Sequence, residues 1–327
     1  MDWMALSLLC ALSLASADAA TKAWLADFST RELTLVRFTL TGAVLSPLLL
    51  GMPPLGDLPP VFWGWIAILL PLEIAAMALY LAAIRDHPLS LTLPYLAFTP
   101  VFVSLVAFVV LGERVTPGGA AGIALVVAGA WLLNVRHARR GDWRSWAMPL
   151  RAILLEPGSR MMLAVAVIYA LTSTLGKGAM QYLPAHYFGA FYFALLGLAT
   201  LVLFGLPQPS RLRRALGLRP GGRPWTVLAV IGLNALMIYT HFLALQLIQV
   251  AYMISVKRVS LLFGILYGAL LFHEPGLRTQ LPAGVLMLAG VTPGQGRRAP
   301  ALIFVNRAPG PFCYHLLRCN VSEVTPL

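Results

Sequence analysis

Long apolar stretches alternate along the chain with short connections rich in polar residues, proline and glycine. A continuous run of about 20 apolar residues is what an α-helix needs to cross a bilayer. Such runs predict nine membrane-spanning helices, at 3–22, 33–51, 61–84, 89–111, 118–135, 161–180, 186–206, 225–246 and 250–272. A tenth apolar run begins at 281 and breaks off at Pro293, so it is too short to span.

Helices fit this pattern better than a membrane β-barrel, because barrel strands alternate apolar and polar residues whereas these runs are continuous. Composition agrees, since 59% of the residues are hydrophobic and 11% are charged, against about 25% charged in ordinary soluble domains. The sequence therefore predicts an all-α polytopic membrane protein.

The first apolar run, "MALSLLCALSLASADAA", has features of a secretory signal, because it ends in a small-residue pattern. However, Asp2 precedes it and no Lys or Arg does. A later segment has the same plan at a place where no signal peptide can lie. We therefore expect the run to be retained as the first membrane helix.

The chain is similar to itself when it is shifted by 161 residues. "AIRDHPLSLTLPYLAFTPVFVSLVAFVVLGE" (83–113) then lies over "ALQLIQVAYMISVKRVSLLFGILYGALLFHE" (244–274) without a gap, and Glu113 is aligned with Glu274. Apolar identities arise by chance in such segments. The paired glutamates at one helix end are better support for a repeat.

A second register, offset by 155 residues, aligns Lys22 with Lys177 and Asp18 with Ser173. A lysine inside two equivalent apolar helices indicates that the chain contains two repeats of about five helices. Since five is odd, the second repeat must enter the membrane from the opposite side, which is an arrangement typical of secondary transporters.

Two stretches, "LPLEIAAMALYLAAIRDHPLSLTLPYLAFTPVFVSLVAFVVLGERV" and "VAYMISVKRVSLLFGILYGALLFHEP", resemble the EamA-type transporters of the drug/metabolite transporter superfamily. The resemblance covers roughly residues 1–292. It implies ten helices in two inverted five-helix repeats, with a Gly-Glu step after each fourth helix. The matching positions are Gly112-Glu113 and His273-Glu274, where His replaces Gly.

These arguments divide the chain into four parts. They are a first repeat at 1–135, a basic connecting loop at 136–159, a second repeat at 160–292 and an atypical tail at 293–327. The tail departs from the family pattern, because the tenth helix is apparently truncated at Pro293.

Ionisable residues inside the apolar runs are the candidates for function. A charge at the bilayer centre costs about 2.5–3.5 kcal/mol, so each one should be paired, face water, or both. The candidates are Asp18, Lys22, Arg37, Glu73, Lys177, His241, Lys257 and Arg258.

Lys257 and Arg258 are adjacent and point about 100° apart on a helix. We expect one to line a central cavity and the other to pair with an acid on a neighbouring helix, either Glu73 or Asp18. The equivalent positions in the first repeat are Leu96 and Ala97. That asymmetry favours a functional role for the two cations.

The remaining charges leave alternatives open. Asp18 and Lys22 are four residues apart, so they could form a local ion pair, and Arg37 could pair with Glu32 or Asp27. Glu73 follows Pro71 in the chain and could carry a coupling proton or neutralise an arginine.

Cations outnumber acids among these residues, which favours a substrate that carries a carboxylate or a phosphate. The predicted substrate-binding residues are Lys257, Arg258, Lys177, Lys22, Tyr95 and Tyr252. The predicted coupling or ion-pair residues are Glu73, Asp18 and Arg37.

Arginines crowd the central loop and the loop after the seventh predicted helix. The positive-inside rule then places the central loop in the cytoplasm and the N-terminus outside. The resemblance instead implies cytoplasmic termini, as in many members of the family. The positive-inside rule and the resemblance therefore disagree, and we base the expected topology on the arginine distribution. The expected location is a plasma membrane of the bacterial inner-membrane type.

The resulting hypothesis is a secondary transporter of a small anionic or zwitterionic metabolite, working by alternating access, and the resemblance favours export. The alternative is a flippase, or an accessory subunit, that handles a lipid or lipid-linked anion. The stretch "GGAAG" (118–122) could serve contact between repeats or a homodimer interface.

Other classes find no support in the sequence. It contains no H-E-x-x-H, no G-x-S-x-G and no G-x-x-x-x-G-K-[ST], and no nucleic-acid-binding motif interleaves its basic residues with aromatics. Cys313, His315 and Cys319 lack a fourth metal ligand. We therefore expect no enzyme activity, no cofactor, no metal and no nucleic-acid partner.

Overall fold

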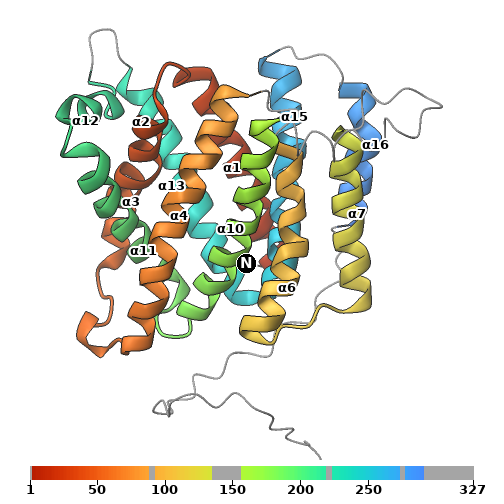
Figure 1. Ribbon diagram of the computed structural model, residues 1–327, viewed down its shortest axis with the longest axis horizontal. Helices are drawn as coiled ribbons and strands as arrows, with labels where there is room; N and C mark the ends of the chain where they lie inside the picture. The colour runs from red at the N-terminus through yellow and green to blue at the C-terminus, as the bar shows by residue number, and fades with distance from the viewer. Residues whose placement is uncertain (1, 88–92, 135–155, 219–222, 273–276, 291–327) are drawn as a thin grey trace, which may run out of the picture.

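A computed structural model describes residues 2–87, 93–134, 156–218, 223–272 and 277–290. Within these ranges every regular element is a helix, and most of the helices stand side by side in one bundle (Figure 1). The predicted central loop lies almost wholly outside the described residues, and Glu274 and the tail do so entirely.

Regular elements of the first half follow the predicted order. They are α1 (Trp3–Trp24), α2 (Thr30–Thr34), the π-helical η1 (Leu35–Leu40), α3 (Thr41–Leu45), η2 (Ser46–Leu49), η3 (Leu55–Asp57), α4 (Pro60–Asp86), the 3-10 helix η4 (Leu93–Phe98), α6 (Thr99–Leu111) and α7 (Pro117–Asn134).

The second half contains α10 (Pro157–Ala179), α11 (Ala185–Thr200), the π-helical η6 (Leu201–Gly205), α12 (Pro209–Ala215), α13 (Pro224–Leu247), α14 (Val250–Lys257), α15 (Ser260–Leu271) and α16 (Leu277–Ala289).

Seven helical segments among the described residues are long and apolar enough to cross a membrane. Two further predicted spans appear as shorter apolar helices, at Tyr95–Leu111 and Pro117–Leu132. Gly112 separates them, because it adopts a left-handed conformation with φ of 68° that ends α6. The protein is an all-α polytopic membrane protein.

The helix α16 is short, as the sequence predicts for the tenth apolar run, although it begins at Leu277 rather than 281. It packs against α7 through small residues. A methyl group on Gly129 would lie 2.6 Å from the Ala283 carbonyl oxygen, and one on Gly290 would lie 2.5 Å from that of Gly122. Here the small residues allow two helices of one chain to approach closely.

Helix bounds recur at the two offsets seen in the sequence. Shifted by 155, α1 would cover 158–179, and α10 covers Pro157–Ala179. Shifted by 161, α6 would cover 260–272, and α15 covers Ser260–Leu271. The division into two inverted repeats stays a proposal, and this correspondence supports it.

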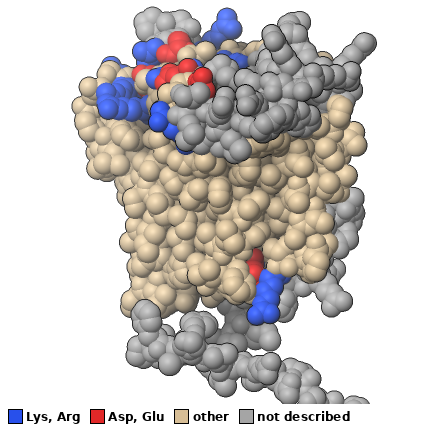
Figure 2. All heavy atoms as spheres, turned by 45° about the vertical axis from the view of Figure 1, so that its right-hand side comes forward, with Lys and Arg blue, Asp and Glu red and all other residues tan. Residues whose placement is uncertain are grey.

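The face shown in Figure 2 has a broad belt without charged side chains, and most of its charges gather at one end of the bundle, although charged side chains also lie at the opposite end. We call the end with most of the charges the arginine end. Exposed charged residues at this end include Asp27, Arg31, Arg85, Asp86, Arg160 and Arg213. The opposite end, where α6 ends and α14 begins, is called the far end (Figure 1).

Candidate substrate cavity

A cavity of about 540 Å³ lies inside the bundle, lined mainly by α1, α4, α10, α13, α14 and α15. Lys22, Ile84, Arg85 and Phe272 line it where these helices reach the arginine end. Its volume falls in the range of pockets that hold small organic molecules.

Helical spacing explains which side chains reach the cavity. Glu73, Met77 and Tyr80 follow one another at intervals of four and three residues along α4, so they share a face, and all three line the cavity. On α13 the same holds for Asn234, Ile238 and His241. Tyr80 and Asn234 are not among the residues predicted for the site, although their helical spacing from Glu73 and His241 was a signal for them.

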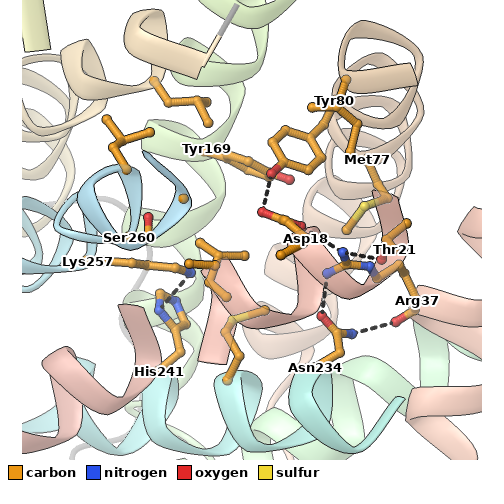
Figure 3. A pocket seen from close by; sticks show the side chains of 18 of the residues that line it. Asp18, Thr21, Arg37, Met77, Tyr80, Tyr169, Asn234, His241, Lys257 and Ser260 are labelled. Atoms are coloured by element: carbon orange, nitrogen blue, oxygen red, sulfur yellow. Dashed lines mark hydrogen bonds and ion pairs between the residues drawn. The ribbon is translucent and has the colours of Figure 1, made fainter. Parts of the chain in front are cut away.

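Asp18 and Arg37 form an ion pair that joins α1 to η1. The Arg37 Nη2 lies 2.7 Å from Asp18 Oδ1, and the Tyr80 hydroxyl donates a 2.6 Å hydrogen bond to Asp18 Oδ2 (Figure 3). The Arg37 side chain is 3% exposed, so its charge is buried. The pair therefore neutralises itself within the wall of the cavity.

Further hydrogen bonds fix Arg37 in place. Its Nη2 also donates to Thr21 Oγ1 at 3.0 Å, and its Nη1 donates to Asn234 Oδ1 at 3.2 Å. Asn234 Nδ2 in return donates to the Arg37 carbonyl at 3.0 Å and to Thr41 Oγ1 at 3.1 Å. This carbonyl lies in the π-helical segment, and such segments are frequent at functional sites.

Two local pairings considered from the sequence are not the ones found. Asp18 pairs with Arg37 rather than with Lys22, whose Nζ lies 4.7 Å from the centre of the Phe272 ring. Glu32 instead forms an ion pair with Arg214 of α12, whose Nε lies 3.5 Å from Glu32 Oε1. The partners of these charges lie on other helices, so the spacing along one helix does not reveal them.

Lys257 and Arg258 both line the cavity, at a 3-10 turn between α14 and α15. Lys257 Nζ lies 3.4 Å from His241 Nδ1, across the pocket from the Asp18 network (Figure 3). Arg258 is 3% exposed, and no hydrogen bond or ion pair connects its side chain to another described residue. The expectation that one of the two would pair with Glu73 or Asp18 is wrong for the described residues.

Glu73 is the second acid in the cavity wall. It belongs to α4, which continues through Pro71, and it lines the cavity together with Thr172. Among the described residues it forms no ion pair within 4.0 Å. Its predicted role as a proton-coupling residue stays a prediction.

Lys177 lies outside the cavity lining, at the far end. Its Nζ lies 2.6 Å from Glu113 Oε1 and donates a 2.6 Å hydrogen bond to the Ile248 carbonyl. Glu113 Oε2 also accepts a 2.9 Å hydrogen bond from the Val250 N–H. These contacts account for the buried lysine without a ligand, so the geometry does not favour its predicted role in substrate binding.

Tyr95 and Tyr252 are also absent from the lining. Tyr95 is 1% exposed in the core, and the Tyr252 hydroxyl accepts a 2.9 Å hydrogen bond from the Thr116 N–H. The side chain of Tyr252 lies directly against Gly119, where a methyl group would collide with it. The tyrosines that do line the cavity are Tyr80, Tyr169, Tyr192 and Tyr267.

The site thus brings together Lys257, Arg258, Lys22, Glu73, Asp18 and Arg37 of the predicted residues. Within the described part of the chain, no group of three or more His, Cys, Asp or Glu side chains is arranged to hold a metal ion.

Comparisons with known proteins agree with this architecture. A solved structure titled "Crystal structure of protein" has a TM-score of 0.60 and 21% sequence identity, over 88% of this chain and 94% of that chain. It shows a shared fold.

A relative from Enterobacter sp. (strain 638), "Probable 4-amino-4-deoxy-L-arabinose-phosphoundecaprenol flippase subunit ArnE", is 32% identical over 72 residues, which cover 22% of this chain and 67% of the relative. The sequence profile of the EamA-like transporter family matches residues 1–135. The chain belongs to the EamA-like transporter family.

Proposed function

We propose that the protein is a secondary transporter of a small organic anion or zwitterion. The observation that carries this proposal is Arg258, a buried guanidinium in the cavity wall without a partner among the described residues. An isolated charge inside a membrane protein is costly, and a bound anion would offset that cost. Lys257, one residue away, adds a second positive charge.

Alternating access is supported by the difference between the two ends of the bundle. The cavity reaches the arginine end, whereas the far end is held by the ion pair of Lys177 with Glu113 and the hydrogen bond between Tyr252 and Thr116. We call these four residues the far-end clasp. If the arginine end is cytoplasmic, as the positive-inside rule favours, this is a form open to the cytoplasm, which suits loading for export.

Substitution of the two cavity cations tests the proposal. The purified protein would be screened by thermal shift against organic acids, sugar phosphates, amino acids and cationic drugs. We expect an anionic or zwitterionic compound to raise the Tm of the wild type, and expect Arg258→Gln and Lys257→Met to lose that rise while remaining folded. Arg213→Gln, which changes an exposed arginine, is the matched control.

Transport in vesicles gives the second readout. Lys257→Met should abolish uptake of the compound found in the screen without lowering expression. Unchanged uptake by both variants would refute the assignment of these cations.

A second candidate function is a lipid flippase or one of its subunits, and the similarity to the flippase subunit from Enterobacter favours it. In that case a lipid headgroup, rather than a free solute, would occupy the cavity. Flipping of a labelled lipid in vesicles, with little response to water-soluble metabolites, would support this function over the first.

A further inference from the structure

Four arginines at the arginine end keep an uncompensated positive charge. They lie on α2, on α12 and directly before α13, and they are Arg31, Arg211, Arg213 and Arg223. Their side chains are at least partly exposed, and none of them forms an ion pair or a side-chain hydrogen bond with another described residue. Like charges gathered on one surface attract an anionic partner.

Arg214 attaches α12 to the first half of the chain. Its Nη2 donates a 2.9 Å hydrogen bond to the Asp27 carbonyl, and its Nε lies 3.5 Å from Glu32 Oε1. The same Nη2 lies 4.0 Å from Asp27 Oδ2. Consequently α12 packs beside α2 (Figure 1). Both acids contact Arg214, so they do not neutralise the four other arginines.

The end of α12 lies against the start of α13. A methyl group on Gly217, just after α12, would lie 3.0 Å from the Cα atom of Pro224. Arg223 precedes this proline and Trp225 follows it. The arginines of α12 and Arg223 therefore belong to one surface.

Large apolar side chains are exposed on the same surface. The rings of Trp24 and Trp225 contact each other edge to face, with their centres 5.3 Å apart, and the two residues are 44% and 55% exposed. Leu216 and Leu218, which follow α12, are exposed as well. Tryptophan is enriched where acyl chains meet headgroups, and arginine side chains at that depth extend their guanidinium groups toward the headgroups.

We propose that this surface binds anionic phospholipids of the leaflet at the arginine end. We call it the α12 surface, and it consists of the four arginines, the two tryptophans and the two leucines named above. The arginines contact headgroup phosphates, and the apolar side chains contact acyl chains. None of these residues lines the central cavity, so the proposal is independent of what the cavity carries.

An anionic lipid fits the α12 surface better than other partners do. A water-soluble anion would leave the tryptophans and leucines without an apolar contact. A zwitterionic headgroup carries its own cation, so it would not compensate the arginines. Basic side chains at a bilayer surface are attracted to anionic lipids, and an amphipathic segment adds apolar contacts to that attraction.

Lipids that differ only in the headgroup test the proposal. The full chain would be purified in a neutral detergent and offered equal amounts of dioleoylphosphatidylglycerol and dioleoylphosphatidylcholine. Native mass spectrometry would then count the bound lipids. We expect the wild type to retain phosphatidylglycerol in preference to phosphatidylcholine. The double variant Arg213→Gln/Arg223→Gln should lower that preference about tenfold, because each arginine adds to the attraction.

Two further double variants separate the α12 surface from net charge. Arg114→Gln/Arg160→Gln removes two exposed arginines elsewhere and should keep the preference of the wild type. Arg213→Lys/Arg223→Lys should retain most of it, since the attraction depends mainly on charge, and high salt should weaken it. Circular dichroism and gel filtration check that each variant is folded.

Three results would overturn the proposal. One is equal retention of the two lipids by the wild type. Another is an equal loss of preference in both glutamine double variants, which would assign the effect to net charge. The third is displacement of the lipid by soluble glycerophosphoglycerol at the same concentration, which would show that the surface binds small anions without the help of its apolar side chains.

Discussion

The ion pair of Asp18 with Arg37 connects two helical segments inside the bundle. Their ion pair joins α1 to η1, and Tyr80, Thr21 and Asn234 add hydrogen bonds to the Asp18 carboxylate and the two terminal nitrogens of Arg37. Removal of one member would leave the other as a buried charge without compensation. Breaking a buried pair in this way costs about 3–5 kcal/mol in proteins generally.

We therefore predict that Asp18→Asn lowers the Tm of the purified protein strongly. The matched control is Asp86→Asn, because Asp86 forms a comparable pair with Arg85 whose side chains are 39% and 47% exposed. Exposed pairs contribute about 0–1 kcal/mol, so the control should change little. Equal Tm values for the two variants would show that the buried pair is not structural.

Residue chemistry was predictable from the sequence only in part. An intramembrane charge is visible as an exception in an apolar run, so Asp18, Arg37, Lys257 and Arg258 could be selected as candidates. Their partners could not be, because the Arg37–Asn234 contact joins positions 197 residues apart. Lys177 looked like a cavity residue for the same reason, since its partner Glu113 lies 64 residues away, in the connection between α6 and α7.

Elements were easier to predict than their irregularities. The length and continuity of the apolar runs indicate helices, and the ends of those helices follow proline and glycine. The π-helical segments and the 3-10 turn between α14 and α15 were not predicted, because they depend on packing against neighbouring helices rather than on any local residue pattern.

The helices α3 and α11 approach each other closely at Gly42, and this contact can be tested by substitution. A methyl group on Gly42 would collide with the carbonyl oxygen of Phe193, which is backbone and cannot rotate away. We predict that Gly42→Ala lowers the Tm, by the equivalent of about 1–3 kcal/mol for an overpacked contact.

Gly232→Ala in α13 is the control for that experiment, since nothing lies within 4 Å of the added methyl group. There the gain in helix propensity should leave the Tm unchanged or slightly higher. If Gly42→Ala were as stable as Gly232→Ala, the two helices would have to pack differently from the arrangement described.

At the scale of the whole molecule, the far-end clasp and the cavity together suggest which contacts must break during transport. The clasp joins the connection between α6 and α7 to α10 and to α14. The lysine aligned with Lys177 in the first half is Lys22, which is exposed at the arginine end. The equivalent positions of the two halves are thus in different surroundings.

We predict that Glu113→Gln increases access to the cavity from the far end, because it removes the charge that holds Lys177. Ser173, which lines the cavity, would be replaced by cysteine in a protein whose native cysteines are serine. An impermeant maleimide then labels it from either side of oriented vesicles. The parent should be labelled mainly from the arginine end, and Glu113→Gln several-fold faster than the parent from the far end.

Asp57→Asn is the control for this measurement, since Asp57 is an exposed acid in the connection before α4. It should label like the parent. Far-end labelling that is the same in Glu113→Gln and in the parent would mean that the ion pair does not restrict access.

The 3-10 turn between α14 and α15 places the cavity cations Lys257 and Arg258 where these two helices meet. Short 3-10 stretches inside long helices are often hinges, and here Arg258 is part of the turn itself. A ligand bound by this side chain would therefore act on the conformation of the turn directly, with no other residue in between. The aligned turn in the first half carries Leu96 and Ala97, whose apolar side chains cannot bind a charged group. Ligand binding would therefore change the conformation of the second half directly and that of the first half only through its contacts with the second.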